Sequence, residues 1–218
     1  MLASLKKKET YARYFKSFKF AFYCMTHPMD GYWDLTHEKR GSIAVANTIL
    51  VLTLIARICS LQFTSFIFNQ VYWPEVNIFL YIASIVFPLA LWCIGNWSLT
   101  TLFDGKAKLP QIYMATCYCM LPYPLFQFPL IIFSNMVTVN EAEFYSTINI
   151  AVLVFCGLYI IVAMSQIHEY TMSKTLLFTI FSIFAMLVIV FILLLFFSMI
   201  SQGIAYFVSI VREILFRI

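Results

Sequence analysis

The sequence predicts an all-α membrane protein, with a five-helix transmembrane bundle preceded by an amphipathic helix at the membrane interface. Of the 218 residues, 62% are hydrophobic and only 11% are charged, whereas soluble domains average about half and about a quarter. A water-soluble chain of this size could not cover so much apolar surface, so we expect the excess to face lipid. The apolar residues also gather into five runs, each long enough for a helix to cross a hydrocarbon core of roughly 30 Å.

The five apolar runs define the predicted spans. They cover roughly residues 42–68, 76–103, 112–137, 146–167 and 175–200. The connections between them are short, so there is no room for a second folded domain. We divide the chain into a cytoplasmic basic and aromatic interfacial segment at 1–41, a five-span domain at 42–205 and a short amphipathic C-terminal tail at 206–218.

The basic residues predict which way the bundle is inserted. Eight of the fourteen Lys and Arg lie before residue 41, and the connections at 104–110 and 168–174 carry two and one more. The other two connections carry none. Because cytoplasmic segments are enriched in Lys and Arg, we expect a cytoplasmic N-terminus. Five spans then place Arg212 and Arg217 outside; the alternative is a re-entrant sixth segment that returns the tail to the cytoplasm.

The polar N-terminal segment contains a predicted amphipathic helix at 9–24. Its aromatic face is formed by Tyr11, Tyr14, Phe15, Phe18 and Phe22. Arg13, Lys16 and Lys19 lie on the opposite side, and Phe20 is the one exception to this division. A helix with one aromatic and one basic side suits the surface of a membrane that contains anionic lipids. The alternative is a helix that packs against the rest of the protein.

Arg57 is the most informative single residue because it lies near the middle of the first predicted span. A guanidinium at that depth costs at least about 2.5–3.5 kcal/mol on insertion scales. Thr53, Ser60 and Thr64 recur with it at helical spacing and form one polar stripe. Such a stripe is expected to face other helices or a wet cavity instead of lipid.

No Asp or Glu lies inside a predicted span to neutralise Arg57. The third span offers other partners, because Pro122 and two later prolines each free a backbone carbonyl from its helical hydrogen bond. We expect Arg57 to donate to these carbonyls, to Gln127 or to Tyr123. Two interpretations follow: Arg57 is a structural tie, or it holds an anionic ligand such as a lipid phosphate.

Nothing in the sequence indicates an enzyme, a cofactor or a metal. There is no G-x-S-x-G, H-E-x-x-H, P-loop or G-x-G-x-x-G pattern, and the six cysteines form no C-x-x-C pair. Four metal-capable side chains would share one face of a continuous helix, but Pro28 and Gly31 predict an interruption, so we expect a turn. The four are His27, Asp30, Asp34 and His37. His168 is expected in a connecting loop.

Two stretches carry a family resemblance. The first is His27-Pro-Met-Asp-Gly-Tyr-Trp-Asp-Leu-Thr-His-Glu-Lys-Arg-Gly41, which runs into the first span. The second is Asn96-Trp-Ser-Leu-Thr-Thr-Leu-Phe-Asp-Gly-Lys-Ala-Lys108, followed by Tyr113-Met-Ala-Thr-Cys-Tyr-Cys-Met-Leu-Pro-Tyr123. Both resemble the bacterial branch of the Yip domain family, the Ypt/Rab-GTPase-interacting proteins, over about residues 20–200. The residues that carry the family motif are His27, Pro28, Asp30, Gly31, Trp97, Asp104, Gly105 and Lys106.

The resemblance implies a non-enzymatic, multi-pass protein of a bacterial cell membrane that acts as a scaffold or accessory factor for other membrane proteins. Its expected partners are those proteins and membrane lipids, anionic at the N-terminal face, and not nucleic acid. The segment from Asp104 to Lys106 is expected to be a tight cytoplasmic turn. In that turn Gly105 takes a left-handed conformation, while Lys106 and Lys108 reach lipid phosphate.

Two other functions stay open. The first is a small permease or transporter subunit in which Arg57 and the proline-broken third span line a path. The second is a lipid-handling membrane protein. A cavity that reaches Arg57 from one face would favour the permease, a cavity that opens sideways to lipid would favour lipid handling, and a sealed bundle would favour the scaffold.

Overall fold

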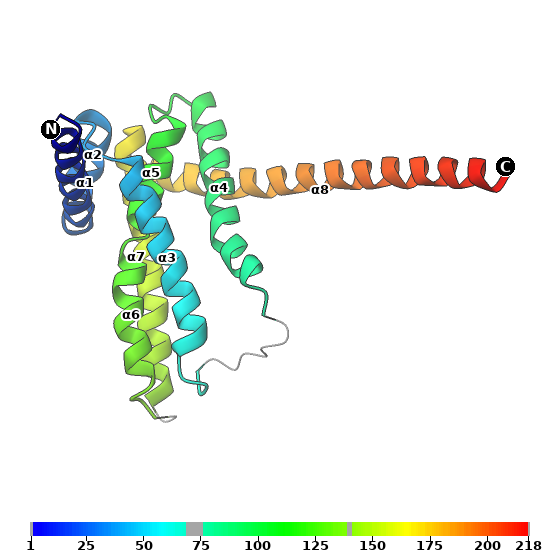
Figure 1. Cartoon of the computed structure of the whole chain (residues 1–218). Helices are drawn as coiled ribbons and strands as arrows, with labels where there is room; N and C mark the ends of the chain where they lie inside the picture. The colour runs from blue at the N-terminus through cyan, green and yellow to red at the C-terminus, as the bar shows by residue number, and fades with distance from the viewer. Residues whose placement is uncertain (1, 69–75, 139–140, 218) are drawn as a thin grey trace.

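The computed structural model describes residues 2–68, 76–138 and 141–217, and the regular structure within these ranges is helical. Five helices are long and apolar enough to cross a membrane when the broken third one is counted as one. This confirms the predicted all-α class with five apolar spans. The helices in Figure 1 are α1 (Leu2–Thr26), α2 (Pro28–His37), α3 (Ile43–Phe63), α4 (Ile78–Leu102), α5 (Leu109–Cys119), α6 (Pro122–Ser134), α7 (Ala142–His168) and α8 (Met172–Arg217).

The helices α3, α6 and α7 run side by side, and α1, α2 and α5 gather at one end of them (Figure 1). We call this end the N-terminal end and the opposite one, where α4 and α7 begin, the far end. Many of the core side chains are small, which lets membrane helices approach closely. Fully buried examples are Val45 and Ala46 of α3, Ala115 and Cys117 of α5, and Ala163 of α7.

The third span is broken at the prolines. Helix α5 ends at Cys119, and α6 begins at Pro122 after a short turn. Proline suits the first position of a helix, because the N–H that it lacks would have no helical partner there. Pro129 lies inside α6, and Pro88 lies inside α4. The chain therefore crosses as two stacked helices at this point.

Helix α1 is longer than the predicted 9–24, and it packs on the bundle through an unexpected face. Phe20, the exception in the predicted pattern, is buried together with Ala21 and Cys24. Tyr11 and Phe15 of the aromatic face keep 57% and 70% of their surface exposed. The helix therefore packs against the protein on one side and leaves aromatic side chains on another.

The predicted interruption at Pro28 is present, because α1 ends at Thr26 and α2 begins at Pro28. The predicted turn through Gly31 is wrong, because residues 28–37 form helix α2. Pro28 starts this helix at a position where proline is favourable, and Gly31 lies inside it, where α2 passes close to α1. A Cβ atom on Gly31 would lie 2.7 Å from the Cα of Cys24. The glycine therefore permits close packing of two helices instead of ending one.

Helix α8 differs from the prediction in length and direction. A span at 175–200 with a separate tail was expected, but one helix continues from Met172 to Arg217. Figure 1 shows α8 crossing the direction of α3 and α7. Its first part packs on α4, where Gly95 lies against Met186. From Phe191 to Phe216 every residue is exposed.

Candidate functional site

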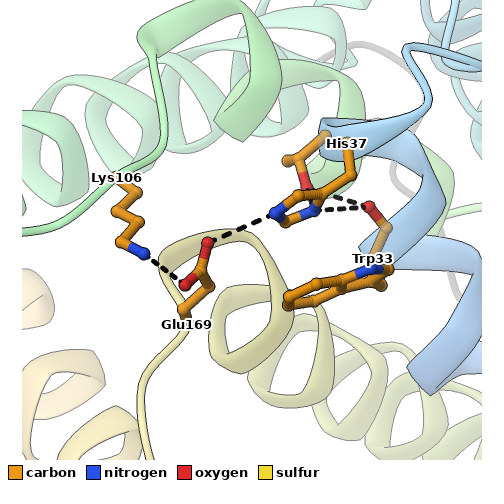
Figure 2. Close-up of polar contacts among 5 residues, drawn as sticks. Trp33, His37, Lys106 and Glu169 are labelled. Atoms are coloured by element: carbon orange, nitrogen blue, oxygen red, sulfur yellow. Dashed lines mark hydrogen bonds and ion pairs between the residues drawn. The ribbon is translucent and has the colours of Figure 1, made fainter.

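The two motif stretches meet at the N-terminal end of the bundle, on the carboxylate of Glu169. Lys106, from the connection between α4 and α5, donates a hydrogen bond to Glu169 Oε2. His37, at the end of α2, lies with its Nε2 3.3 Å from Glu169 Oε1. The His37 ring stacks on Trp33 with the ring centroids 3.8 Å apart (Figure 2). Glu169, which directly follows α7, thus links the end of α2 to the connection between α4 and α5.

The electrostatics of this cluster favour the charged form of Glu169. The hydrogen bond from Lys106 is the largest influence, and it holds the pKa of the Glu169 carboxyl below its ordinary value. His37 acts in the same direction. Lys106 was expected to reach lipid phosphate, and in the structure it has an intramolecular partner instead.

The turn between α4 and α5 has a different left-handed residue from the one predicted. Asp104 adopts a φ of 59°, and none of the glycines in the described ranges has a positive φ. The N–H of Gly105 donates to the carbonyl of Thr100 at 2.8 Å, which closes the end of α4. Gly105 is needed for space, because an added Cβ would lie 2.6 Å from the Thr100 Cβ and 2.9 Å from His168 Nδ1.

His168 is a buried residue at the end of α7, so its predicted place in a loop is wrong. Only 2% of its surface is exposed. Its Nε2 lies 3.0 Å from the side-chain oxygen of Asn96, and the amide nitrogen of Asn96 donates to the Ser182 hydroxyl at 3.1 Å. This hydrogen-bonded set joins α4, α7 and the start of α8.

The other motif residues do not converge on one pocket. His27 occupies the N-cap position of α2 without a capping side-chain hydrogen bond, is exposed and stacks on Tyr23. Asp30 is exposed in the first turn of α2, and Trp97 keeps 42% of its surface exposed on α4. Pro28 and Gly31 shape α2. The motif therefore mainly supports the N-terminal end of the fold, and within the described ranges no group of three His, Cys, Asp or Glu is placed to hold a metal.

Gln127 takes a partner other than Arg57. This buried side chain on α6 donates to the Ser60 hydroxyl at 3.0 Å. Pro122 is buried at the start of α6. Arg57 instead lies with its guanidinium carbon 5.9 Å from the centroid of the Tyr81 ring, and it also interacts with the Tyr123 hydroxyl. Of the expected partners, Tyr123 is thus the one close to Arg57.

Two hollows adjoin Arg57, and together we call them the Arg57 crevice. The first has a volume of about 150 Å³ and extends toward the far end past Ser60, Thr64 and Tyr145. The second has a volume of about 420 Å³ and lies deeper in the sense that it is farther from the far end. Arg57 and Asn149 line both hollows. Arg57 itself stays exposed, so the bundle is not sealed around it.

The comparison with known families gives one result. The Yip1 domain matches residues 22–196, from α1 into α8. The chain belongs to the Yip1 domain family. Yip1 proteins are generally non-enzymatic membrane trafficking proteins, and this Yip1 chain is a multi-span membrane protein. No curated protein and no solved structure matches it.

Several site residues of this Yip1 protein escaped prediction from the sequence. Glu169 was one of several charged residues in short connections, and nothing local marked it as the partner of Lys106. Tyr81 and Asn149 lie in the second and fourth apolar runs, and Tyr145 directly precedes the fourth run. The signal that could have found Asn149 is its polarity within an apolar span, since polar residues at that depth usually face the bundle interior.

Proposed function

We propose that this Yip1 protein is a non-enzymatic scaffold or accessory factor that binds other membrane proteins through α8. The observation that supports the proposal is the C-terminal part of this helix. Every residue from Phe191 to Phe216 is exposed, although most of these side chains are large and apolar. The family match ends at residue 196, so most of this exposed segment lies beyond it.

The length of α8 argues for a protein partner in addition to lipid. No charged residue occurs from Thr175 to Val211, a stretch of about 55 Å at roughly 1.5 Å per residue. The hydrocarbon core is about 30 Å thick, and a helix tilted by about 40° holds only about 39 Å within it. An α8 that crossed at that tilt would still leave about 15 Å of apolar helix beyond the hydrocarbon. In the structure α8 runs across the direction of α3 and α7 (Figure 1), so its exposed segment extends away from the bundle, where another protein surface would cover it.

One face of the exposed segment carries the polar groups. Ser198, Gln202 and Ser209 recur at helical spacing, and the Gln202 amide donates to the Ser198 hydroxyl at 3.1 Å. Ile204 and Phe207 lie on the opposite face of the helix. Hydrogen-bonding side chains on membrane helices bind other helices, so we assign the Ser198 face to the partner and the Ile204 face to lipid.

Photo-crosslinking in intact membranes tests this assignment. A photoreactive residue is placed at Ser198 or Ser209 and, as the matched control, at Ile204 or Phe207. The proposal predicts a discrete protein adduct from the serine positions and lipid adducts from the control positions. Gln202→Leu is expected to weaken the protein adduct. Lipid adducts alone from the serine positions, or the same protein adducts from both faces, would contradict the proposal.

We further propose that the protein lies in the cell membrane of a bacterium with its N-terminus in the cytoplasm. The support is the clustering of basic residues before residue 41 and their absence from the connections at 69–75 and 138–145. In this orientation the Glu169 cluster faces the cytoplasm and the far end faces outward. Labelling of single introduced cysteines from the two sides of the membrane tests this orientation.

Lipid handling is a second candidate function, because the bundle is open at Arg57. The two hollows lie between membrane-spanning helices and leave the guanidinium exposed. A cavity of this kind is accessible from the lipid that surrounds the bundle.

A further inference from the structure

We infer that the Arg57 crevice binds an anionic membrane lipid, with the negatively charged headgroup at Arg57 and an acyl chain in the deeper hollow. This deepens the second candidate function and does not depend on α8. The charge of Arg57, the polarity of the smaller hollow and the position of the larger one each support it.

The charge of Arg57 needs a counterpart that the described part of the chain does not provide. Within the described ranges, no carboxylate lies at ion-pair distance from its guanidinium. Its neighbours are the Tyr81 ring and the Tyr123 hydroxyl, both uncharged. A cation at membrane depth is costly without an anion or water, and a headgroup oxygen would form a charge-assisted hydrogen bond with it.

The smaller hollow suits a headgroup. Arg57, Ser60, Thr64, Tyr81 and Asn149 line it, so donors of hydrogen bonds surround the guanidinium, and none of the lining residues that the structure describes is acidic. Its volume of about 150 Å³ equals that of about five water molecules at roughly 30 Å³ each. A phosphate or carboxylate group fits such a space, and four oxygens of a phosphate could use several donors at once.

The larger hollow suits an acyl chain. Ile85, Met120 and Leu153 give it apolar walls, and it holds about 420 Å³. It lies deeper than the smaller hollow, because Thr53 precedes Arg57 on α3 while Ser60 and Thr64 follow it toward the far end. In a lipid of the leaflet at the far end, the headgroup lies nearer that end than the acyl chain does. The smaller hollow would therefore take the headgroup and the larger one the chain.

Lipid retention by the purified full chain tests the inference. Native mass spectrometry would count phosphatidylglycerol and phosphatidylcholine of identical acyl chains on the wild type and on Arg57→Gln. We expect about tenfold less phosphatidylglycerol on Arg57→Gln, the factor for one lost charge-assisted hydrogen bond, and no change for phosphatidylcholine. Arg212→Gln removes the same charge from exposed α8 and is expected to behave as the wild type.

A second pair of variants covers failure of Arg57→Gln to fold. Ile85→Trp fills the deeper hollow, and Val86→Trp places the same ring at the neighbouring position outside it. Loss of phosphatidylglycerol with Ile85→Trp alone supports the inference. Equal retention of phosphatidylglycerol by the wild type, Arg57→Gln and Ile85→Trp overturns the inference. If inorganic phosphate binds and displaces the lipid, the site belongs to a soluble anion and the lipid assignment is overturned. The α8 proposal is tested independently, because failure of the lipid inference would leave the cross-links from Ser209 unchanged.

Discussion

The ammonium group of Lys106 donates a hydrogen bond to the carboxylate of Glu169, which lies 63 positions later in the chain. Glu169 also contacts His37, so one acidic side chain from the connection between α7 and α8 links α2 to the α4–α5 connection.

Replacing Glu169 with Gln is expected to lower the melting temperature of the protein in detergent. The variant keeps the size of the side chain and removes the charge that Lys106 and His37 share. The effect should be small, because exposed ion pairs contribute little to stability. Glu143→Gln is the matched control, since it removes the same charge from an exposed position in the first turn of α7. Equal melting temperatures for the two variants would show that the contact adds no stability.

The contribution of Glu169 is expected to disappear in acid. Lys106 holds the pKa of Glu169 below its ordinary value in the folded protein. A carboxyl with a lowered folded-state pKa stabilises the fold above its unfolded pKa, and this stabilisation is lost as the pH falls through the folded value. The difference in melting temperature between wild type and Glu169→Gln should therefore be present at neutral pH and shrink as the pH falls below the ordinary pKa of a glutamate. A difference that grows on acidification contradicts the assignment.

Gly105→Ala is expected to destabilise the protein by about 1–3 kcal/mol, the usual cost of overpacking. Its Cβ would lie 2.8 Å from the backbone oxygen of Thr100 and 2.9 Å from His168 Nδ1. Gly157→Ala on α7 is the control, because nothing lies within 4 Å of its added Cβ, and it should be neutral or slightly stabilising. Thermal unfolding of both variants in the same detergent measures the difference. Equal stabilities would mean that the turn relaxes freely around position 105.

Asn96→Ala is expected to cost about 1–3 kcal/mol, because it leaves buried polar groups without partners. The Asn96 side-chain oxygen lies 3.0 Å from His168 Nε2, and its amide nitrogen donates to the Ser182 hydroxyl at 3.1 Å. The substitution therefore also removes the polar link between α4, α7 and α8. Ser182→Ala breaks only one of these hydrogen bonds and should cost less. Limited proteolysis near residue 171 would show whether α8 loosens first. A larger loss of stability for Ser182→Ala than for Asn96→Ala would contradict this ranking.

The spans could be predicted because a membrane helix is a local property of about 20 consecutive apolar residues. The polar stripe around Arg57 was equally local, since Thr53, Ser60 and Thr64 follow helical spacing. Their surroundings could not be predicted in the same way. The Tyr81 ring belongs to another helix, and Gln127 turned to Ser60 instead of Arg57.

The errors came from residues whose conformation depends on their neighbours in space. Pro28 and Gly31 indicated a turn, but proline at the start of a helix and glycine at a close crossing suit a helix equally well. Gly105 was expected to be left-handed, and Asp104 took that conformation while Gly105 made room for Thr100 and His168. In both cases the sequence pattern identified a glycine that the structure requires, but the glycine is required for close packing and not for a turn conformation.

Cysteine accessibility tests the central claim, that the apolar helices cross the membrane with the N-terminal end inside. Lys108→Cys and Glu143→Cys would be introduced singly into a chain without other cysteines; both positions are exposed and lie at opposite ends of the broken third span. With a membrane-impermeant maleimide on intact cells, the account predicts labelling at position 143 and none at position 108 until the membrane is permeabilised. Labelling of both positions from the same side would contradict it.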